Sequence, residues 1–187
     1  MAMPADAVLA PLTTVIDGEN FTPRLLSLLS NVLVARESRA LRTRFGLGTN
    51  DWRVISALGI RPGSTASEIC EFIAVNKAIV SKSVGLLTDR GLVVQAEEGS
   101  RSRQLFLTAA GAEMHDAMLP ISMRGQEIIL ADLSAEDVAQ LNQLLHRLLA
   151  HVRELQAEDA LDSPVDDEDT SGDASGEGRV GLAEVAG

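Results

Sequence analysis

Small, hydroxyl and basic side chains gather on one side of a predicted helix over residues 76–90. Val80, Val84 and Leu87 recur at i, i+4 and i+7 and form the opposite, apolar face. Lysines attract phosphate oxygens, and short polar side chains let a helix approach the edges of bases. We interpret the polar side as a surface for nucleic-acid contact; an ordinary solvated helix face is the alternative. It comprises Asn76, Lys77, Ala78, Ser81 and Lys82, with the last two as the base readers.

Three hydroxyl side chains stand at the start of a shorter predicted helix over residues 65–73. They are Ser64, Thr65 and Ser67. The N-terminus of a helix presents free N–H groups to anions, so these residues are candidates for donating to phosphate. Thr65 and Glu68 also have the spacing of a capping box, a role that is compatible with the first.

Two arginines follow at the tip of a predicted β-hairpin, whose strands are residues 92–97 and 104–107. In this place Arg101 and Arg103 could reach a minor groove or the phosphate backbone. They could also be ordinary turn charges. A helix, a turn, a second helix and a basic hairpin are typical of a DNA-binding module, because the second helix enters the major groove.

Longer helices must position this module. Apolar stripes and helix-ending signals predict them over residues 22–45, 51–58, 109–132 and 135–156, and Pro120 is expected to kink or interrupt the third. The last helix carries a heptad seam that one module cannot cover, so we expect it to pair with the first helix and with a second copy of the chain. The seam consists of Val138, Leu141, Leu145, Leu148, Val152 and Leu155. The predicted fold is mainly α with a small β-hairpin wing (α+β).

Charge is distributed unevenly along the 187 residues, which carry a net charge of −11. Residues 157–187 contain ten acidic residues and one arginine, lack an apolar period and are predicted to be a disordered tail. The remainder is nearly neutral and can hold a local basic face. We therefore divide the chain into an arm (residues 1–20), a folded domain (residues 21–156) and the acidic tail. The tail either increases solubility or competes with DNA for the basic face.

Several classes of function find no support in the sequence. A signal peptide and a long apolar run are both missing, so a cytoplasmic protein without a membrane span is expected. The sequence contains no GxSxG, HExxH, P-loop or dinucleotide motif, so we expect neither an enzyme nor a cofactor. The three histidines lack metal-ligand spacing, so no metal is expected. Cys70 is interpreted as a buried, inert thiol.

The order of elements over about residues 21–156 resembles the MarR family of bacterial winged helix-turn-helix regulators. The resemblance rests on the motifs FGL (45–47), DWRVI (51–55), ASEI (66–69), NKAIVSK (76–82) and LTDRGLV (87–93), and on the hairpin exit that ends in Leu107 and Thr108. It implies a homodimer joined through residues 21–45 and 109–156, with a DNA-binding lobe over about residues 49–108. It also implies that Arg101 reaches the minor groove. Gly99 departs from the family, which usually has at this position an aspartate that orients the wing arginine.

The resemblance further implies a small organic effector of the aromatic acid, phenolic or acyl-CoA type. The candidate contacts are Arg39, Trp52, Met114 and Met118. A guanidinium group suits a carboxylate or phosphate, and thioethers suit an adaptable apolar pocket. Alternatively, Arg39 belongs to a solvated run of arginines and Trp52 is simply part of the core.

The sequence as a whole predicts a sequence-specific transcriptional regulator. We expect a repressor that leaves a palindromic operator in double-stranded DNA when its effector binds. Two alternatives remain open at this point. One is a DNA-binding regulator without an effector switch, and the other is a winged-helix protein-interaction module that uses the acidic tail.

Overall fold

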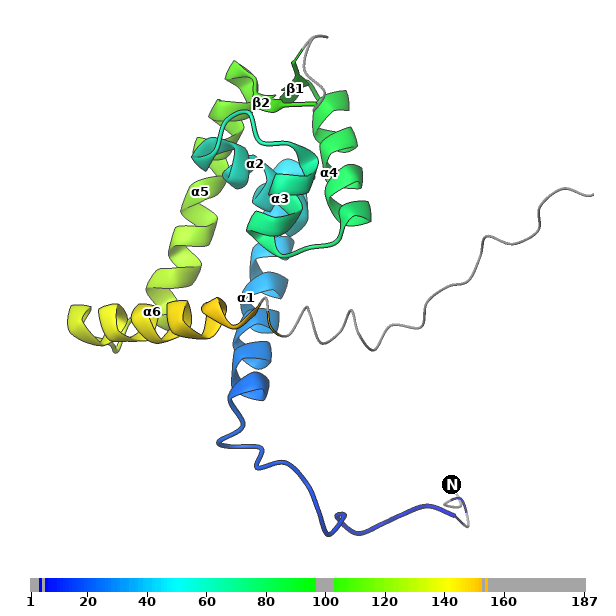
Figure 1. Ribbon diagram of the computed structural model, residues 1–187, viewed down its shortest axis with the longest axis vertical. Coiled ribbons are helices and arrows are strands. Elements are labelled where there is room, and N and C mark those ends of the chain that lie inside the picture. The colour runs from blue at the N-terminus through cyan, green and yellow to red at the C-terminus, as the bar shows by residue number, and fades with distance from the viewer. Residues whose placement is uncertain (1–3, 5, 97–102, 153, 155–187) are drawn as a thin grey trace, which may run out of the picture. The chain divides into compact units, whose positions relative to one another are not determined.

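The computed structural model describes residues 4, 6–96, 103–152 and 154 of the chain. These residues form six helices and one two-stranded hairpin (Figure 1). In chain order the elements are α1 (Thr22–Phe45), α2 (Thr49–Ile60), α3 (Ala66–Ile73), α4 (Lys77–Asp89), β1 (Val93–Gln95), β2 (Leu105–Leu107), α5 (Ala109–Ile129) and α6 (Ala135–Ala150). The chain divides into two compact units after Asp132, and α6 lies in the second. The predicted fold class, mainly helical with a small hairpin, is confirmed.

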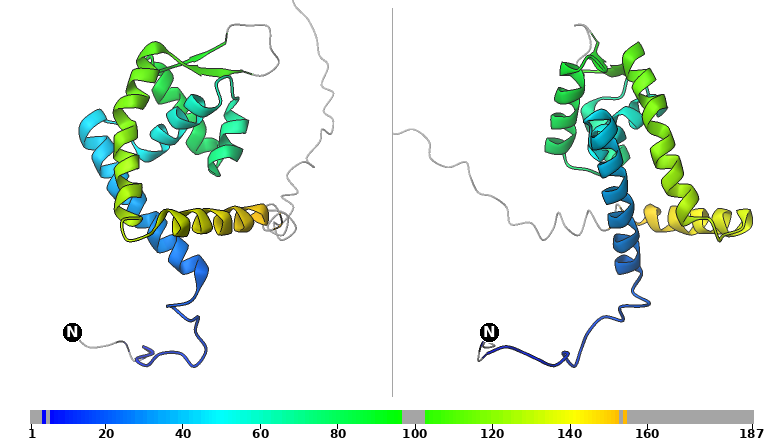
Figure 2. Two further views of the ribbon diagram at one scale, coloured as in Figure 1. Left: turned by 90° about the vertical axis from the view of Figure 1, so that its left-hand side faces the viewer. Right: turned by 180° about the vertical axis from the view of Figure 1, so that it is seen from behind.

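The core of the first unit lies where α2 packs against α3, α4, α5 and β2. On α2, Trp52, Ile55 and Leu58 recur at steps of three residues and are buried, as the sequence predicts. Ile69 of α3 and Leu105 of β2 close the same core. α1 and α5 pack beside each other along this lobe (Figure 2).

The end of α1 is fixed by glycine and arginine. Gly46 adopts left-handed backbone with φ of 64°, and its N–H donates to Arg42 O. Arg90, which follows α4, donates from Nη1 to Phe45 O and from Nη2 to Gly46 O, both at 3.0 Å. The last carbonyls of a helix lack partners within the helix. Arg90 therefore ties the end of α1 to the end of α4.

The wing is an antiparallel pair in which Val94 lies opposite Phe106. Its second strand also bonds to the loop before α3. Gly63 N–H donates to Leu105 O at 2.9 Å, and Leu105 N–H donates to Ser64 O at 3.1 Å. Gly63 has φ of 83°, and a Cβ there would lie 3.2 Å from Phe106 Cζ, so this position favours glycine. The loop holds the wing beside the start of α3.

Two sequence predictions need correction. α5 continues through Pro120 without interruption. Proline cannot donate to the carbonyl four residues earlier, but Met118 and Ile121 on either side are buried in the core and keep this segment helical. Phe72 stands three residues after the buried Ile69, a spacing that predicts an inward-facing side chain. It is instead 39% exposed, and the Arg61 guanidinium lies 4.4 Å from its ring centroid.

The bounds of three predicted helices also shift. α2 begins earlier, at Thr49, and extends to Ile60. α5 ends at Ile129, three residues before the predicted end, and α6 is helical as far as Ala150. α6 begins at a side-chain cap, because Ser134 Oγ accepts a hydrogen bond from Asp137 N–H at 3.1 Å.

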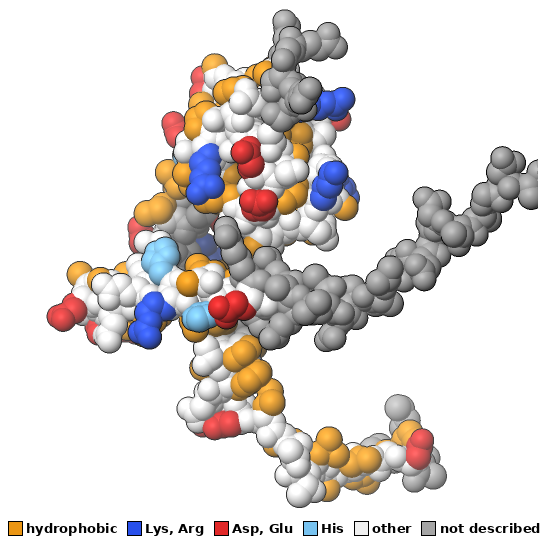
Figure 3. Space-filling view, viewed as in Figure 1, with side chains coloured by type: hydrophobic (Ala, Val, Ile, Leu, Met, Phe, Trp, Pro, Cys, Tyr) orange, Lys and Arg blue, Asp and Glu red, His pale blue; other side chains and the backbone are white. Residues whose placement is uncertain are grey.

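Exposed apolar side chains mark two helices. The first turns of α1 expose Leu25, Leu28 and Leu29, and Figure 3 shows hydrophobic side chains along this part of α1. No residue of α6 is buried, and Leu141 and Leu148 of its seam are exposed. None of the described helices is both long enough and apolar enough to cross a membrane.

Candidate nucleic-acid interface

The helix-turn-helix is formed by α3 and α4, and both begin at a side-chain cap. Thr65 Oγ1 accepts from Glu68 N–H at the start of α3, and Asn76 Oδ1 accepts from Ile79 N–H at 3.0 Å at the start of α4. Between them Ala74 adopts left-handed backbone with φ of 52° and ends α3. Asn76, a predicted DNA contact, thus also fixes where the second helix begins.

The predicted polar face of α4 is exposed in the structure. Lys77, Ala78, Ser81 and Lys82 are all exposed, and so is Gly85, around which a Cβ would meet nothing within 4 Å. The opposite, apolar face differs from the prediction at one position. Val80 and Leu87 are buried as predicted, but Ser83 is the third buried residue and Val84 is half-buried. α4 therefore presents short side chains on its outward face, as a helix that enters a groove requires.

A hollow of about 760 Å³, the wing-side hollow, lies along one flank of α4. It gathers side chains from the start of α3, from α4 and from the wing. Five of the predicted DNA contacts line it: Thr65, Ser67, Lys77, Ser81 and Arg103. In Figure 3 basic side chains lie along the α4 edge of the lobe, while acidic side chains lie over α3. The wing-side hollow is therefore suited to an anionic backbone.

The hydroxyl groups before α3 already have partners within the protein. Thr65 N–H and Thr65 Oγ1 both donate to Glu68 Oε2, at 2.7 and 2.9 Å. The Thr65 backbone hydrogen bond, followed by that from its hydroxyl, holds the pKa of Glu68 below its usual value. Ser64 Oγ donates to Arg61 O. Ser67 is exposed and lines the hollow, so it offers the freer hydroxyl of the three.

The opposite flank of α4 borders a second hollow of about 520 Å³, the α2-side hollow. Lys82, although predicted with Ser81, lines this hollow and not the wing-side one. The hollow also contains residues that the sequence did not single out: Val34, Ser38 and Arg42 of α1, Gly48, Thr49, Asn50 and Asp51 at the start of α2, and Ile79, Ser83 and Leu86 of α4. The one sequence signal for this hollow is Gly48, which stands just before the first turn of α2.

Arg101 and Gly99 lie outside the described residues, as does the whole predicted tail, residues 157–187. The predicted role of Arg101 and the consequence of Gly99 remain predictions. Of the two wing arginines, Arg103 is the one that the structure describes, and it is exposed.

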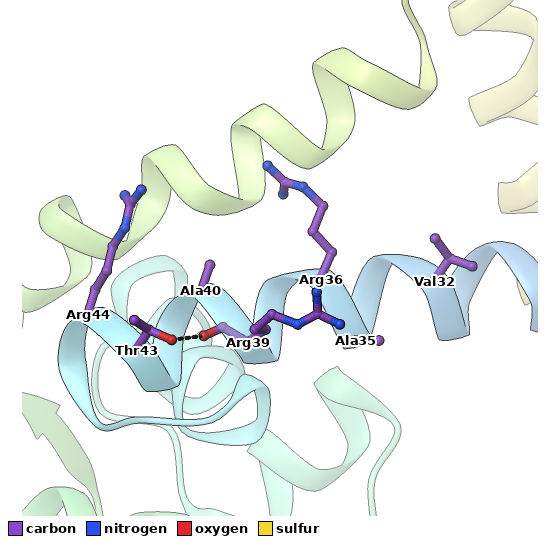
Figure 4. Close-up of a pocket in the computed structure, with 7 residues that line it drawn as sticks. All are labelled: Val32, Ala35, Arg36, Arg39, Ala40, Thr43 and Arg44. Atoms are coloured by element: carbon purple, nitrogen blue, oxygen red, sulfur yellow. Dashed lines mark hydrogen bonds between the residues drawn. The ribbon is translucent and has the colours of Figure 1, made fainter.

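The four predicted effector contacts are not gathered in one place. Arg39 lines a hollow of about 590 Å³ along α1, and Figure 4 shows Arg36 and Arg44 reaching from the same hollow towards α5. Trp52, Met114 and Met118 do not line this hollow. Its remaining lining residues are Val32, Ala35, Ala40 and Thr43.

Trp52 and Met118 are buried in the core, and Met114 packs against it half-buried. The Trp52 ring lies 5.4 Å from the ring of His115, centroid to centroid. Arg36 Nη1 donates to Ile121 O of α5 at 3.2 Å, so one arginine of the hollow is held by the protein itself. Arg36 is thus more than a solvated charge, because it links α1 to α5.

The helix-turn-helix, the exposed face of α4 and the attached wing define a winged helix-turn-helix protein. Comparison with known proteins narrows the class. The model of the MarR family matches residues 45–104. The transcriptional regulator HosA of Escherichia coli O127:H6 (strain E2348/69 / EPEC) is 28% identical over 100 residues, which cover 52% of this chain and 74% of HosA.

Solved structures agree with this result. The MarR/EmrR family regulator from Acinetobacter sp. ADP1 superposes with a TM-score of 0.69 at 24% identity, covering 74% of this chain and 99% of that one. The PcaV regulator from Streptomyces coelicolor, solved in complex with its natural ligand, has a TM-score of 0.62 at 20% identity, covering 74% and 99%. Residues 45–104 thus match the MarR family model, and the chain has a winged-helix fold similar to that of MarR-family transcriptional regulators.

Proposed function

We propose that this regulator binds double-stranded DNA as a homodimer, recognises a palindromic operator and represses transcription until a small organic effector binds. The observation that carries the DNA-binding part is the outward face of α4, which is small, polar and basic and borders the wing-side hollow. We propose Lys77 and Arg103 as contacts to phosphates, and Ser81 and Lys82 as contacts to base edges.

Exposed apolar surface supports the dimer. The first turns of α1 and the seam of α6 carry leucines that water contacts in the single chain. Burying such stripes against a second copy gives a symmetric pair, and the two α4 helices then read two half-sites. Half-sites one turn apart require a separation of about 34–36 Å between the recognition helices.

An effector would act by shifting the population of dimers. It must bind better to a dimer in which the two α4 helices no longer match successive major grooves. The arginine-lined hollow on α1, with Arg39 in it, supports an anionic ligand. The PcaV relative is solved with a natural ligand, which supports a ligand-responsive protein of this fold. We propose the aromatic acid, phenolic or acyl-CoA class, with Arg39 as a contact.

The first test is selection of binding sites from random duplex DNA with the purified full chain. An enriched palindrome whose binding is lost in Lys82→Ala supports a dimeric sequence reader. Arg124→Ala is the matched control, because Arg124 is exposed on α5 and pairs with Glu127 of the same helix. No enrichment at low salt from an intact dimer would overturn the proposal and favour a protein-interaction module.

The enriched duplex then serves to test the effector. Aromatic acids, phenolics and acyl-CoA thioesters are added to the complex, and release of the labelled duplex is measured. We expect one class to release the DNA from the original protein at concentrations that leave the Arg39→Ala complex intact. Release of both complexes alike would remove Arg39 from the effector site.

A further inference from the structure

The arm (residues 1–20) carries apolar side chains that the fold of the single chain does not use. We infer that the arm of one copy packs along α6 of a second copy, beside the heptad seam of that helix. This inference rests on the dimer in the function proposed above and adds a contact to it. Both segments lie outside residues 45–104, which the family model matches.

Five aliphatic side chains of the arm are exposed to water. Residues 6–21 form neither helix nor strand. The exposed fractions of the five side chains range from 59% to 76%, and Figure 3 shows hydrophobic side chains along this segment. A contiguous run of large apolar side chains on a surface marks a place that another molecule covers. The five are Val8, Leu9, Leu12, Val15 and Ile16.

A hydrogen-bonded turn fixes the arm to the start of α1. Asp17 Oδ2 accepts from Asn20 Nδ2 at 2.7 Å, and Phe21 N–H donates to Asp17 O at 2.9 Å. Arg24 Nη1 donates to Gly18 O. The apolar run of the arm is therefore joined through a defined turn to the exposed leucines of α1, which the proposed dimer covers. An arm attached at that surface lies within reach of the second copy.

The charge of the arm narrows the kind of surface that it can meet. Its charged side chains are Asp6, Asp17 and Glu19, and it contains neither lysine nor arginine. Segments that bind anionic membranes carry basic residues, and DNA phosphates would repel the carboxylates. The arm therefore requires an apolar surface whose charged side chains are basic.

α6 of a second copy offers such a surface. Residues 138–150 contain no acidic side chain, and Arg147 lies in the last turn of the helix. Leu144 and Leu149 flank the seam and are 46% and 63% exposed. The positions that flank a heptad seam usually carry charged side chains. In α6 these positions are apolar, so pairing of the seam alone leaves them in water.

The lengths of the two segments agree. Residues 8–16 in an extended conformation span about 30 Å, at about 3.3 Å per residue. The 16 residues of α6 span about 24 Å. The arm can thus run along the whole helix. In a symmetric dimer each copy gives one arm and receives the other, so the same contact forms twice.

The first test measures the dimer dissociation constant of Leu12→Asp in the full chain by sedimentation equilibrium. Leu12 is 66% exposed, so the fold of the single chain does not depend on it, and circular dichroism checks the helices. The matched control is Ile60→Asp, which places the same charge on an aliphatic side chain that is 63% exposed at the end of α2. We expect the constant to rise about tenfold or more in Leu12→Asp and to stay unchanged in the control.

The second test identifies which copy the arm touches. A chain with Leu9→benzoylphenylalanine is mixed with an excess of the original chain carrying a peptide tag, and the mixture is irradiated. We expect a cross-link to the tagged copy within residues 144–149 of α6. A cross-link confined to the photoreactive chain would show that the arm folds onto its own copy, and this would overturn the inference.

The outcomes separate this inference from the function on which it rests. If the original protein is a monomer at every concentration, the proposed dimer and the arm contact both fail. If a dimer forms with the same constant in Leu12→Asp and no cross-link reaches the tagged copy, the arm contact alone is overturned. If the protein instead sediments with phosphatidylcholine vesicles, and Leu12→Asp abolishes this without weakening the dimer, the arm binds lipid and the inference is again overturned.

Discussion

Gly111 offers a sharp test of how α5 is attached to the wing. It lies in the first turn of α5 and is buried. A Cβ at this position would lie 2.0 Å from Leu92 O, which is a backbone atom just before β1, and 3.4 Å from Leu107 Cβ. Leu92 O also accepts from Thr108 N–H at 3.0 Å. Gly111→Ala must therefore move the start of the wing away from α5.

The size of the effect follows from opposing contributions. Replacing glycine by alanine in a helix stabilises by at most about 1 kcal/mol. Against this, overpacking costs about 1–3 kcal/mol, and a weakened Thr108–Leu92 hydrogen bond costs about 0.5–1.5 kcal/mol. The net loss is about 2 kcal/mol. For a chain of this length it corresponds to a fall in Tm of roughly 4–8 °C.

The assay is thermal unfolding at one fixed protein concentration, because dimer formation makes Tm concentration-dependent. Gly85→Ala is the matched control: it is the same substitution inside a helix, but its Cβ meets nothing within 4 Å. We expect Gly85→Ala to raise Tm by a few degrees, about 2–4 °C. A Tm for Gly111→Ala equal to or above that of the original protein would refute the described contact between α5 and the wing.

Four further outcomes are expected. Gly85→Ala adds a methyl group to the outward face of α4, so it should weaken operator binding while it stabilises the fold. Binding is measured by fluorescence anisotropy, and an unchanged affinity would show that this face is not part of the interface. Arg90→Ala removes both hydrogen bonds to the end of α1 and should lower the free energy of unfolding in urea by about 1–2 kcal/mol, whereas Arg124→Ala should have little effect. The lowered pKa of Glu68 stabilises the fold above the unfolded pKa, and this stabilisation is lost as pH falls through the folded pKa. The free energy of unfolding in urea should therefore fall less between about pH 5 and pH 3 in Glu68→Gln than in the original protein. An identical pH profile for the two proteins would contradict this cap. Deleting residues 157–187 should tighten DNA binding and steepen its salt dependence, and unchanged affinity would exclude competition by the tail.

Local patterns in the sequence determined the helices, their caps and the exposed face of α4. Thr65, Asn76 and Ser134 stand before apolar-periodic segments, and each caps the helix that follows. Such signals act within one turn of backbone, so they can be recognised without knowledge of the fold. The i, i+4, i+7 spacing around Val80 likewise placed the lysines of α4 on the exposed side.

Contacts between distant segments were decided by the tertiary structure. Pro120 stays within a helix because the core holds its neighbours, and Phe72 turns outward although its spacing suggested burial. Arg90 and the two carbonyl groups that it bonds at the end of α1 are 45 and 44 positions apart in the sequence. The α2-side hollow needs α1, the start of α2 and α4 in one place, and no spacing along the chain encodes that approach. Periodicity states which side of a helix is apolar; only packing of the helices decides which side chains meet, because each contact depends on the positions of two elements at once.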